Sequence, residues 1–190
     1  LPDVLAAVSG PVVVVPLLLS AGFHVHHDVA RAVAEHPDAV ASAPLGPDWS
    51  LAEIGASRLL QSGAHRRDTV VLGGSGSSDE RAMADVDEAA RRLGALWGGP
   101  VRVGHLGHRG TPLPEVVTQA RADGAERVVV SSYLLAPGYF QDRALESGAD
   151  LVTAPLLSAS PDPALVELVV RRVEQARTVR AAWTARGSSV

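Results

Sequence analysis

The sequence has 190 residues, of which 46% are hydrophobic and 20% are charged, and its formal net charge at pH 7 is -4. This composition predicts a globular protein with a sizeable core and argues against a nucleic-acid surface, which would need clustered lysine and arginine. The absence of cysteine excludes disulfides and thiolate metal sites and fits a cytoplasmic protein. Any metal chemistry must therefore use His, Asp, Glu or backbone oxygen.

The longest apolar run is Pro11–Ala21, and it is too short to cross a bilayer, which takes about 20 residues. Within it, Val12–Leu19 is continuously apolar and rich in β-branched side chains. This pattern is typical of a strand that is covered on both faces of a parallel sheet. The run then breaks at a glycine and continues as FHVHHD, where three histidines fall within four positions. We expect the strand to end in an active-site loop.

Helical and strand patterns alternate along the chain with short connections. Helices are predicted at Leu1–Val8, Asp28–Glu35, Leu51–Gln61, Asp79–Trp97, Leu113–Ala122 and Pro163–Trp183, and further strands at Ala39–Leu45, Thr69–Gly73, Val101–Leu106, Arg127–Leu135 and Asp150–Thr153. In the helix Asp79–Trp97, the predicted buried stripe consists of Met83, Val86, Ala90 and Leu93. The alternation predicts an α/β protein with a parallel sheet.

Four short motifs occur twice in the same order, at offsets of 111 to 116 residues. LPDV returns as LPEV, PVVVVPLLLSAGF as RVVVSSYLLAPGY, APL as APL, and DWSLAEI as DPALVEL. We infer two copies of one α/β unit, which form two similar doubly wound lobes over residues 1–64 and 65–190. The second copy has a strand–helix–strand segment, Thr69–Pro112, before its LPEV. The first copy begins at LPDV, so we expect its lobe to be truncated at the N-terminus.

The stretch VVPLLLSAGFHVHHDV, the APL that follows it and YLLAPGYFQDR in the second copy resemble the two-domain sirohydrochlorin chelatases of the class II chelatase family. The resemblance implies a chelatase-like fold and a lyase that inserts Co(II) or Fe(II) into sirohydrochlorin in cobalamin or sirohaem biosynthesis. It implies this tetrapyrrole as the partner, a divalent metal ion as substrate and no organic cofactor. Family members carry two active-site histidines, one in this loop and one in a His-Gly-Ser motif. The loop histidine corresponds to His24, whereas the second copy has Ser75 at the place of the other histidine and Phe140 opposite His24.

A neutral imidazole suits metal insertion, because it binds Fe, Co, Ni and Zn ions and its ordinary pKa of about 6.5 lets it accept a proton near neutral pH. We therefore predict His24 as a metal ligand or proton acceptor. His26 and His27 are predicted to bind the incoming ion or to pair with substrate carboxylates, and Gly22 and Phe23 to contact the macrocycle. The alternative is a non-catalytic tetrapyrrole- or metal-binding protein of the same fold, since the second active-site histidine has no counterpart here.

The other notable residues are given structural roles. The turn GGSGSSD lacks the lysine of a phosphate-binding P-loop, so Asp79 is predicted simply as the N-cap of the helix that follows, and Asp48 as the N-cap of an earlier helix. The remaining histidines are predicted to be surface or packing residues: His36, His65, His105 and His108.

Overall fold

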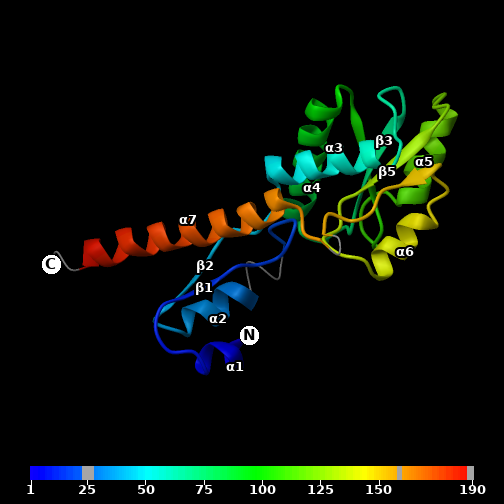
Figure 1. The fold of residues 1–190 in the computed structure, drawn as a ribbon. Helices are drawn as coiled ribbons and strands as arrows, with labels where there is room; N and C mark the ends of the chain where they lie inside the picture. The colour runs from blue at the N-terminus through cyan, green and yellow to red at the C-terminus, as the bar shows by residue number, and fades with distance from the viewer. Residues whose placement is uncertain (23–27, 158–159, 188–190) are drawn as a thin grey trace.

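The computed structural model describes residues 1–22, 28–157 and 160–187, with side chains up to residue 179. Its helices are α1 (Pro2–Ala6), α2 (Ala30–Ala34), α3 (Trp49–Gln61), α4 (Glu80–Trp97), α5 (Leu113–Ala122), α6 (Tyr139–Leu145) and α7 (Pro163–Gly187). Its strands are β1 (Val12–Val14), β2 (Ala39–Ala41), β3 (Thr69–Gly74), β4 (Val101–His105), β5 (Val128–Ser132) and β6 (Leu151–Val152). The strands form two sheets, and each pairing is parallel (Figure 1). The predicted α/β class is confirmed.

The larger sheet has the strand order β4-β3-β5-β6 and is covered on both faces. Successive side chains of a strand point to opposite faces, and in β3 the side chains of Val70 and Leu72 pack with α3 and α4, whereas Val71 packs with α5 and α6. All three are at most 2% exposed. Burial on both faces explains why these strands are continuously apolar in the sequence.

The smaller sheet consists of β1 and β2, and it repeats the geometry of β5 and β6. Val13 is paired with Val40, and the residues 116 and 111 positions later, Val129 and Leu151, are paired in the same way. The backbone hydrogen bonds beyond the strands also recur. Ser42 N donates to Val14 O, and the corresponding Thr153 N donates to Val130 O, both at 2.9 Å. The sequence repeat is therefore a structural repeat.

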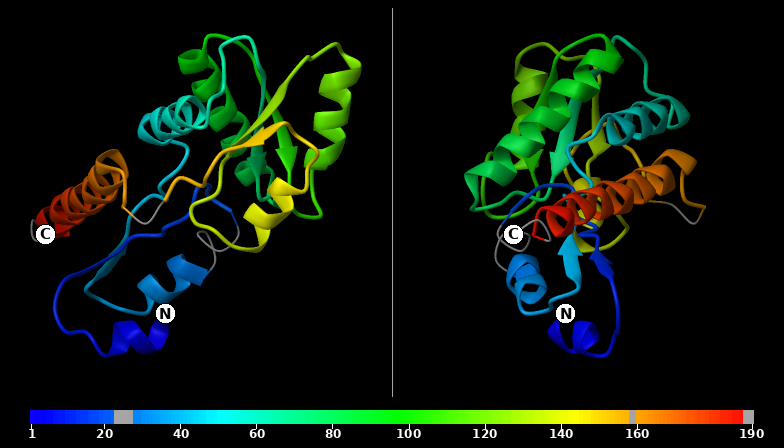
Figure 2. Two further views of the ribbon diagram at one scale, coloured as in Figure 1. Left: turned by 45° about the vertical axis from the view of Figure 1, so that its right-hand side comes forward. Right: turned by 90° about the vertical axis from the view of Figure 1, so that its left-hand side faces the viewer.

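The two halves exchange their final helices. α3 follows β2 in the chain, yet it packs against α4 and β5 of the larger sheet, and α7 follows β6 but packs against β1, β2 and α3. Figures 1 and 2 show α7 extending from the larger sheet along the smaller one. This packing crosses the division between residues 1–64 and 65–190, which stays a prediction about domain organisation.

Several local predictions were wrong in detail, and the strands predicted over Ala39–Leu45 and Arg127–Leu135 end at Ala41 and Ser132. The strand predicted over Val12–Leu19 ends at Val14, since Pro16 has no N–H to continue the ladder. In α4 the buried stripe begins at Ala82 and not at Met83, which is half-buried, because Ala82 lies one helical turn before Val86. Both predicted N-caps are confirmed, with the carboxylates of Asp48 and Asp79 accepting the amide protons of the second residue after each.

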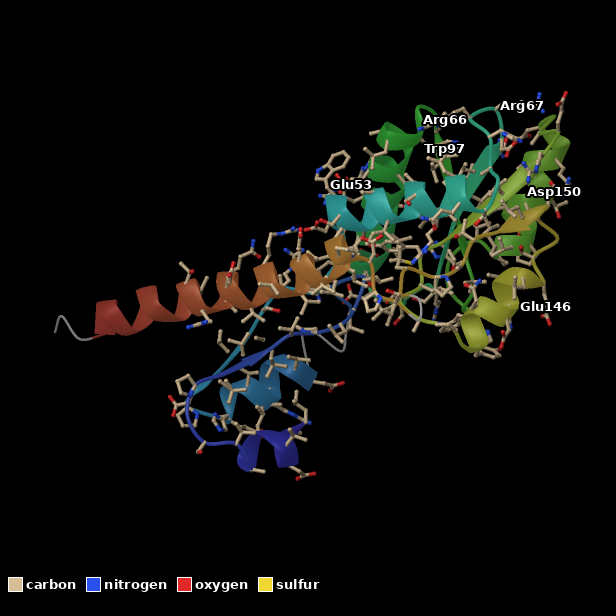
Figure 3. The ribbon with its side chains drawn as sticks, viewed as in Figure 1. Glu53, Arg66, Arg67, Trp97, Glu146 and Asp150 are labelled. Carbon is tan, nitrogen blue, oxygen red and sulfur yellow. The ribbon has the colours of Figure 1, made fainter. Side chains whose placement is uncertain are left out.

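At the end of the larger sheet where β3 begins, the segment before the strand packs against the end of α4. Figure 3 shows Arg66 beside Trp97 at this end, and the Arg66 guanidinium carbon lies 4.6 Å from the centroid of the Trp97 ring. Arg66 also donates to Leu96 O at 2.8 Å. Within the described ranges, no helix is long and apolar enough to span a membrane.

Candidate active site

A cleft of about 640 Å³ opens at the carboxyl ends of the strands, between the two halves of the chain. Its walls come from three segments that each follow a strand: residues 17–20 and 22 after β1, residues 75–78 after β3, and residues 133–135 after β5. Val86 of α4 and Phe140 of α6 complete the lining. The carboxyl edge of an open parallel sheet is where α/β proteins place their ligands, so this cleft is the candidate active site.

The turn after β3 depends on two glycines that let backbones approach closely. Gly76 has a φ of 80°, and a Cβ there would lie 2.6 Å from Arg109 O. A Cβ on Gly107 would lie 2.5 Å from Ser75 O. The turn consequently lies against the loop that follows β4, and it presents Ser75, Ser77 and Ser78 to the cleft.

The Leu17–Gly22 segment, which leads to the predicted histidine loop, is bound to the second half of the chain. The Tyr133 hydroxyl donates to Leu19 O at 3.1 Å, and Ala21 N donates to the Asp85 carboxylate at 2.7 Å. Tyr133 is only 6% exposed, and its burial, followed by the charge of Asp85, raises its pKa well above the ordinary value of 10.0, so the hydroxyl stays a donor. Sequence reasoning missed Tyr133 and Asp85, although the repeat pairs Tyr133 with Leu17, a change from apolar to polar.

The predicted site residues fall into two groups. Gly22 lines the cleft, as do Ser75 and Phe140, the two second-half positions at which the family resemblance led us to expect active-site histidines. The φ of Gly22 lies outside the left-handed region, and a Cβ there would be 3.4 Å from the Ala82 Cβ, so glycine is not required by backbone strain. The other group lies outside the described residues: Phe23, His24, His26 and His27.

His105 is a packing residue, as predicted, but an unusual one. It is 6% exposed at the end of β4, and its Nδ1 has no hydrogen-bond partner among the residues that the structure describes. Burial lowers the pKa of His105, against a smaller opposing effect of the Asp87 carboxylate, so the imidazole is neutral at pH 7. A smaller cavity of about 310 Å³ adjoins it, lined also by His108 and Arg143. Among the residues that the structure describes, no group of three or more His, Asp or Glu side chains could hold a metal ion.

Parallel sheets with helices on both faces and a cleft between two repeated halves define a chelatase-like α/β protein, and solved structures share this fold. SirB from Bacillus subtilis with Fe3+ matches 90% of this chain and 73% of its own, with a TM-score of 0.71 at 23% identity. SirB of Bacillus subtilis subspecies spizizenii, described as a sirohydrochlorin chelatase in complex with cobalt, matches 90% of this chain and 71% of its own, with a TM-score of 0.66 at 22% identity. CbiX, described as the terminal enzyme of sirohaem biosynthesis in denitrifying bacteria, matches 93% of this chain and 80% of its own, with a TM-score of 0.67 at 17% identity.

The family is shown by the sequence itself. The model of the CbiX family matches residues 1–62 and 69–176, so the chain belongs to the CbiX family of class II chelatases. A search of curated protein sequences found no match. The resemblance inferred from the histidine loop is therefore confirmed at the level of family and fold.

Proposed function

We propose that this protein inserts a divalent metal ion, Co(II) or Fe(II), into sirohydrochlorin. The observation that carries the proposal is the family match, which spans the apolar strand, the histidine loop and the second half of the chain. The related SirB structures are described with Fe3+ and with cobalt, and one of them as a sirohydrochlorin chelatase. Metal insertion is the reaction that unites these descriptions.

The cleft is suited to a flat, polyanionic macrocycle. Its volume of about 640 Å³ lies in the usual range for small-molecule sites. Apolar side chains from both halves, including Leu19, Val86 and Leu135, offer surfaces for the rings. The serine-rich turn after β3 offers hydroxyls and amides to carboxylates, which such donors bind well.

His24 is the residue to which we assign the chemistry. It lies two positions after Gly22, which lines the cleft, and its imidazole would act as a ligand of the incoming ion or accept a proton from the macrocycle. The macrocycle loses two protons as the metal ion enters, so a base with a pKa of about 6.5 lowers the barrier near neutral pH. Phe23 would contact the macrocycle beside Gly22, and His26 and His27 would bind the ion on its way in or pair with carboxylates.

Metallation of sirohydrochlorin, followed by its absorbance change, tests the proposal. His24→Ala should lower the rate about a hundredfold or more, while His65→Ala, which alters an exposed residue before β3, should leave it unchanged. Competition between Co(II) and Fe(II) under anaerobic conditions identifies the preferred ion. Near-normal activity of His24→Ala would contradict the assignment, and tight binding of sirohydrochlorin without turnover by the unaltered chain would favour the non-catalytic alternative.

A further inference from the structure

The Leu17–Gly22 segment differs from its own repeat in how its backbone is bound. In the second half, Leu134 O and Leu135 O each accept a backbone N–H from the strand-end loop of the same half, from Leu156 at 2.9 Å and Leu157 at 2.7 Å. In the first half, Leu18 O likewise accepts from Leu45 N at 2.9 Å. The amide of Gly46, however, corresponds to Leu157 and also donates to Leu18 O, at 3.3 Å. The donor to Leu19 O comes instead from Tyr133 of the other half.

The contact of Ala21 with Asp85 also occurs in only one direction between the halves. Ala21 N donates to the Asp85 carboxylate, but the residue 116 positions later is Pro137, which has no N–H. The position that corresponds to Tyr133 is Leu17, which has no hydroxyl. Residues 65–190 therefore bind the segment before His24 through two polar contacts, and no equivalent pair is possible in the reverse direction.

Glycine at position 46 makes the first contact possible. A Cβ on Gly46 would collide with both Leu19 O and the Tyr133 hydroxyl, whereas its counterpart in the second half is Leu157, which carries a full side chain. The close approach of the Tyr133 hydroxyl, Leu19 O and Gly46 therefore has no counterpart at Leu157 in the second half.

We propose that Tyr133 and Asp85 are positioning residues, which fix the Leu17–Gly22 segment from which the chain continues to His24. This inference rests on the proposed function for its catalytic consequence. It assigns the second half, which has Ser75 and Phe140 where active-site histidines are expected, a defined part in the reaction. The partly buried carboxylate and the buried hydroxyl bind two groups separated by a single residue, so together they restrain both the position and the direction of the chain.

The test uses the full chain with Tyr133→Phe and Asp85→Ala, which leaves no acceptor for Ala21 N, and with Asp87→Ala as the matched control at an exposed position of the same helix. Hydrogen–deuterium exchange of peptides covering residues 17–22 is measured without metal or substrate. Both test variants should exchange faster there than the unaltered chain, with no change in other peptides. In metallation assays kcat should fall about ten- to a hundredfold, the loss expected when a reacting group is misplaced, while KM for sirohydrochlorin changes little.

Unchanged exchange in both test variants overturns the proposal. Faster exchange with an unaltered kcat shows that the contacts are structural only, and also overturns it. If the unaltered chain does not metallate sirohydrochlorin, the proposed function fails, but the exchange experiment still decides whether the two residues fix the segment. Asp85→Ala keeps the test decisive if the buried Tyr133→Phe variant does not fold.

Discussion

Replacing Asp48 should destabilise the protein, because its carboxylate joins α3 to α7. One oxygen accepts from Ser50 N at 3.0 Å at the start of α3, and each of the guanidiniums of Arg171 and Arg172 in α7 lies 3.0 Å from the carboxylate. Arg172 also donates to Pro44 O at 2.8 Å and to Leu45 O at 3.0 Å. This network fixes the loop that precedes α3, including Gly46, which lies against Leu19.

The contacts set the expected size of the effect. Loss of an N-cap costs about 1 kcal/mol, and loss of a hydrogen bond to a charged group costs about 1.5–3 kcal/mol. The Arg172 side chain is 12% exposed, so its contact should count fully, whereas Arg171 is 42% exposed and adds little. Because Arg172 keeps two carbonyl partners, we expect Asp48→Ala to lower the free energy of unfolding by about 3 kcal/mol. Asp48→Asn keeps an acceptor for Ser50 N and should cost about 1.5 kcal/mol.

Urea denaturation followed by circular dichroism measures these losses. Asp123→Asn is the control, since its ion pair with Arg102 is exposed, at 45% and 37%, and should contribute little to stability. The reasoning is refuted if Asp48→Ala and Asp123→Asn lose the same amount of stability.

The same network predicts a pH dependence. Burial by itself raises the pKa of Asp48, but the hydrogen bond from the Ser50 amide and the charges of Arg172 and Arg171 outweigh it, so that the pKa lies below its ordinary value of 3.8. The unfolded chain therefore binds the proton more readily than the folded one, and the stabilisation is present above pH 4 and lost as the pH falls through the folded pKa. The difference between the unaltered chain and Asp48→Asn should shrink accordingly in acid.

Two further predictions concern β4. Burial lowers the pKa of His105 below its ordinary value of 6.5, although Asp87 opposes this, so the folded protein should lose stability as the pH falls below that value. His105→Phe should remove this loss, seen as an unfolding temperature that changes less than that of the unaltered chain between pH 7.5 and 5.5, and an identical change in both would contradict the assignment. Gly104→Ala should cost about 1–3 kcal/mol by overpacking, because a Cβ would lie 2.9 Å from the Leu113 Cα, whereas Gly99→Ala has open space and should be near neutral in the same urea assay.

The sequence by itself determined the features that depend on neighbouring residues or on one repeating unit. The N-caps at Asp48 and Asp79 act over two residues, and the apolar runs of the larger sheet report burial on both faces. The repeat identified corresponding strands correctly down to their register, because one chain pattern folds in one way in both halves. It also identified the family to which the chain belongs. The assignment of the chemistry to His24 stays a prediction.

Only the tertiary structure decided which surfaces meet. An amphipathic helix shows that one face is buried but not against which partner, so the exchange of α3 and α7 between the halves could not be predicted. Tyr133 and Leu19 are 114 residues apart, and no local pattern indicates that a hydroxyl and a carbonyl at such a distance in sequence will form a hydrogen bond. The Leu17–Gly22 segment is therefore held by packing between the two halves. A single difference between the repeats, tyrosine at position 133 where the first half has Leu17, provides one of these contacts.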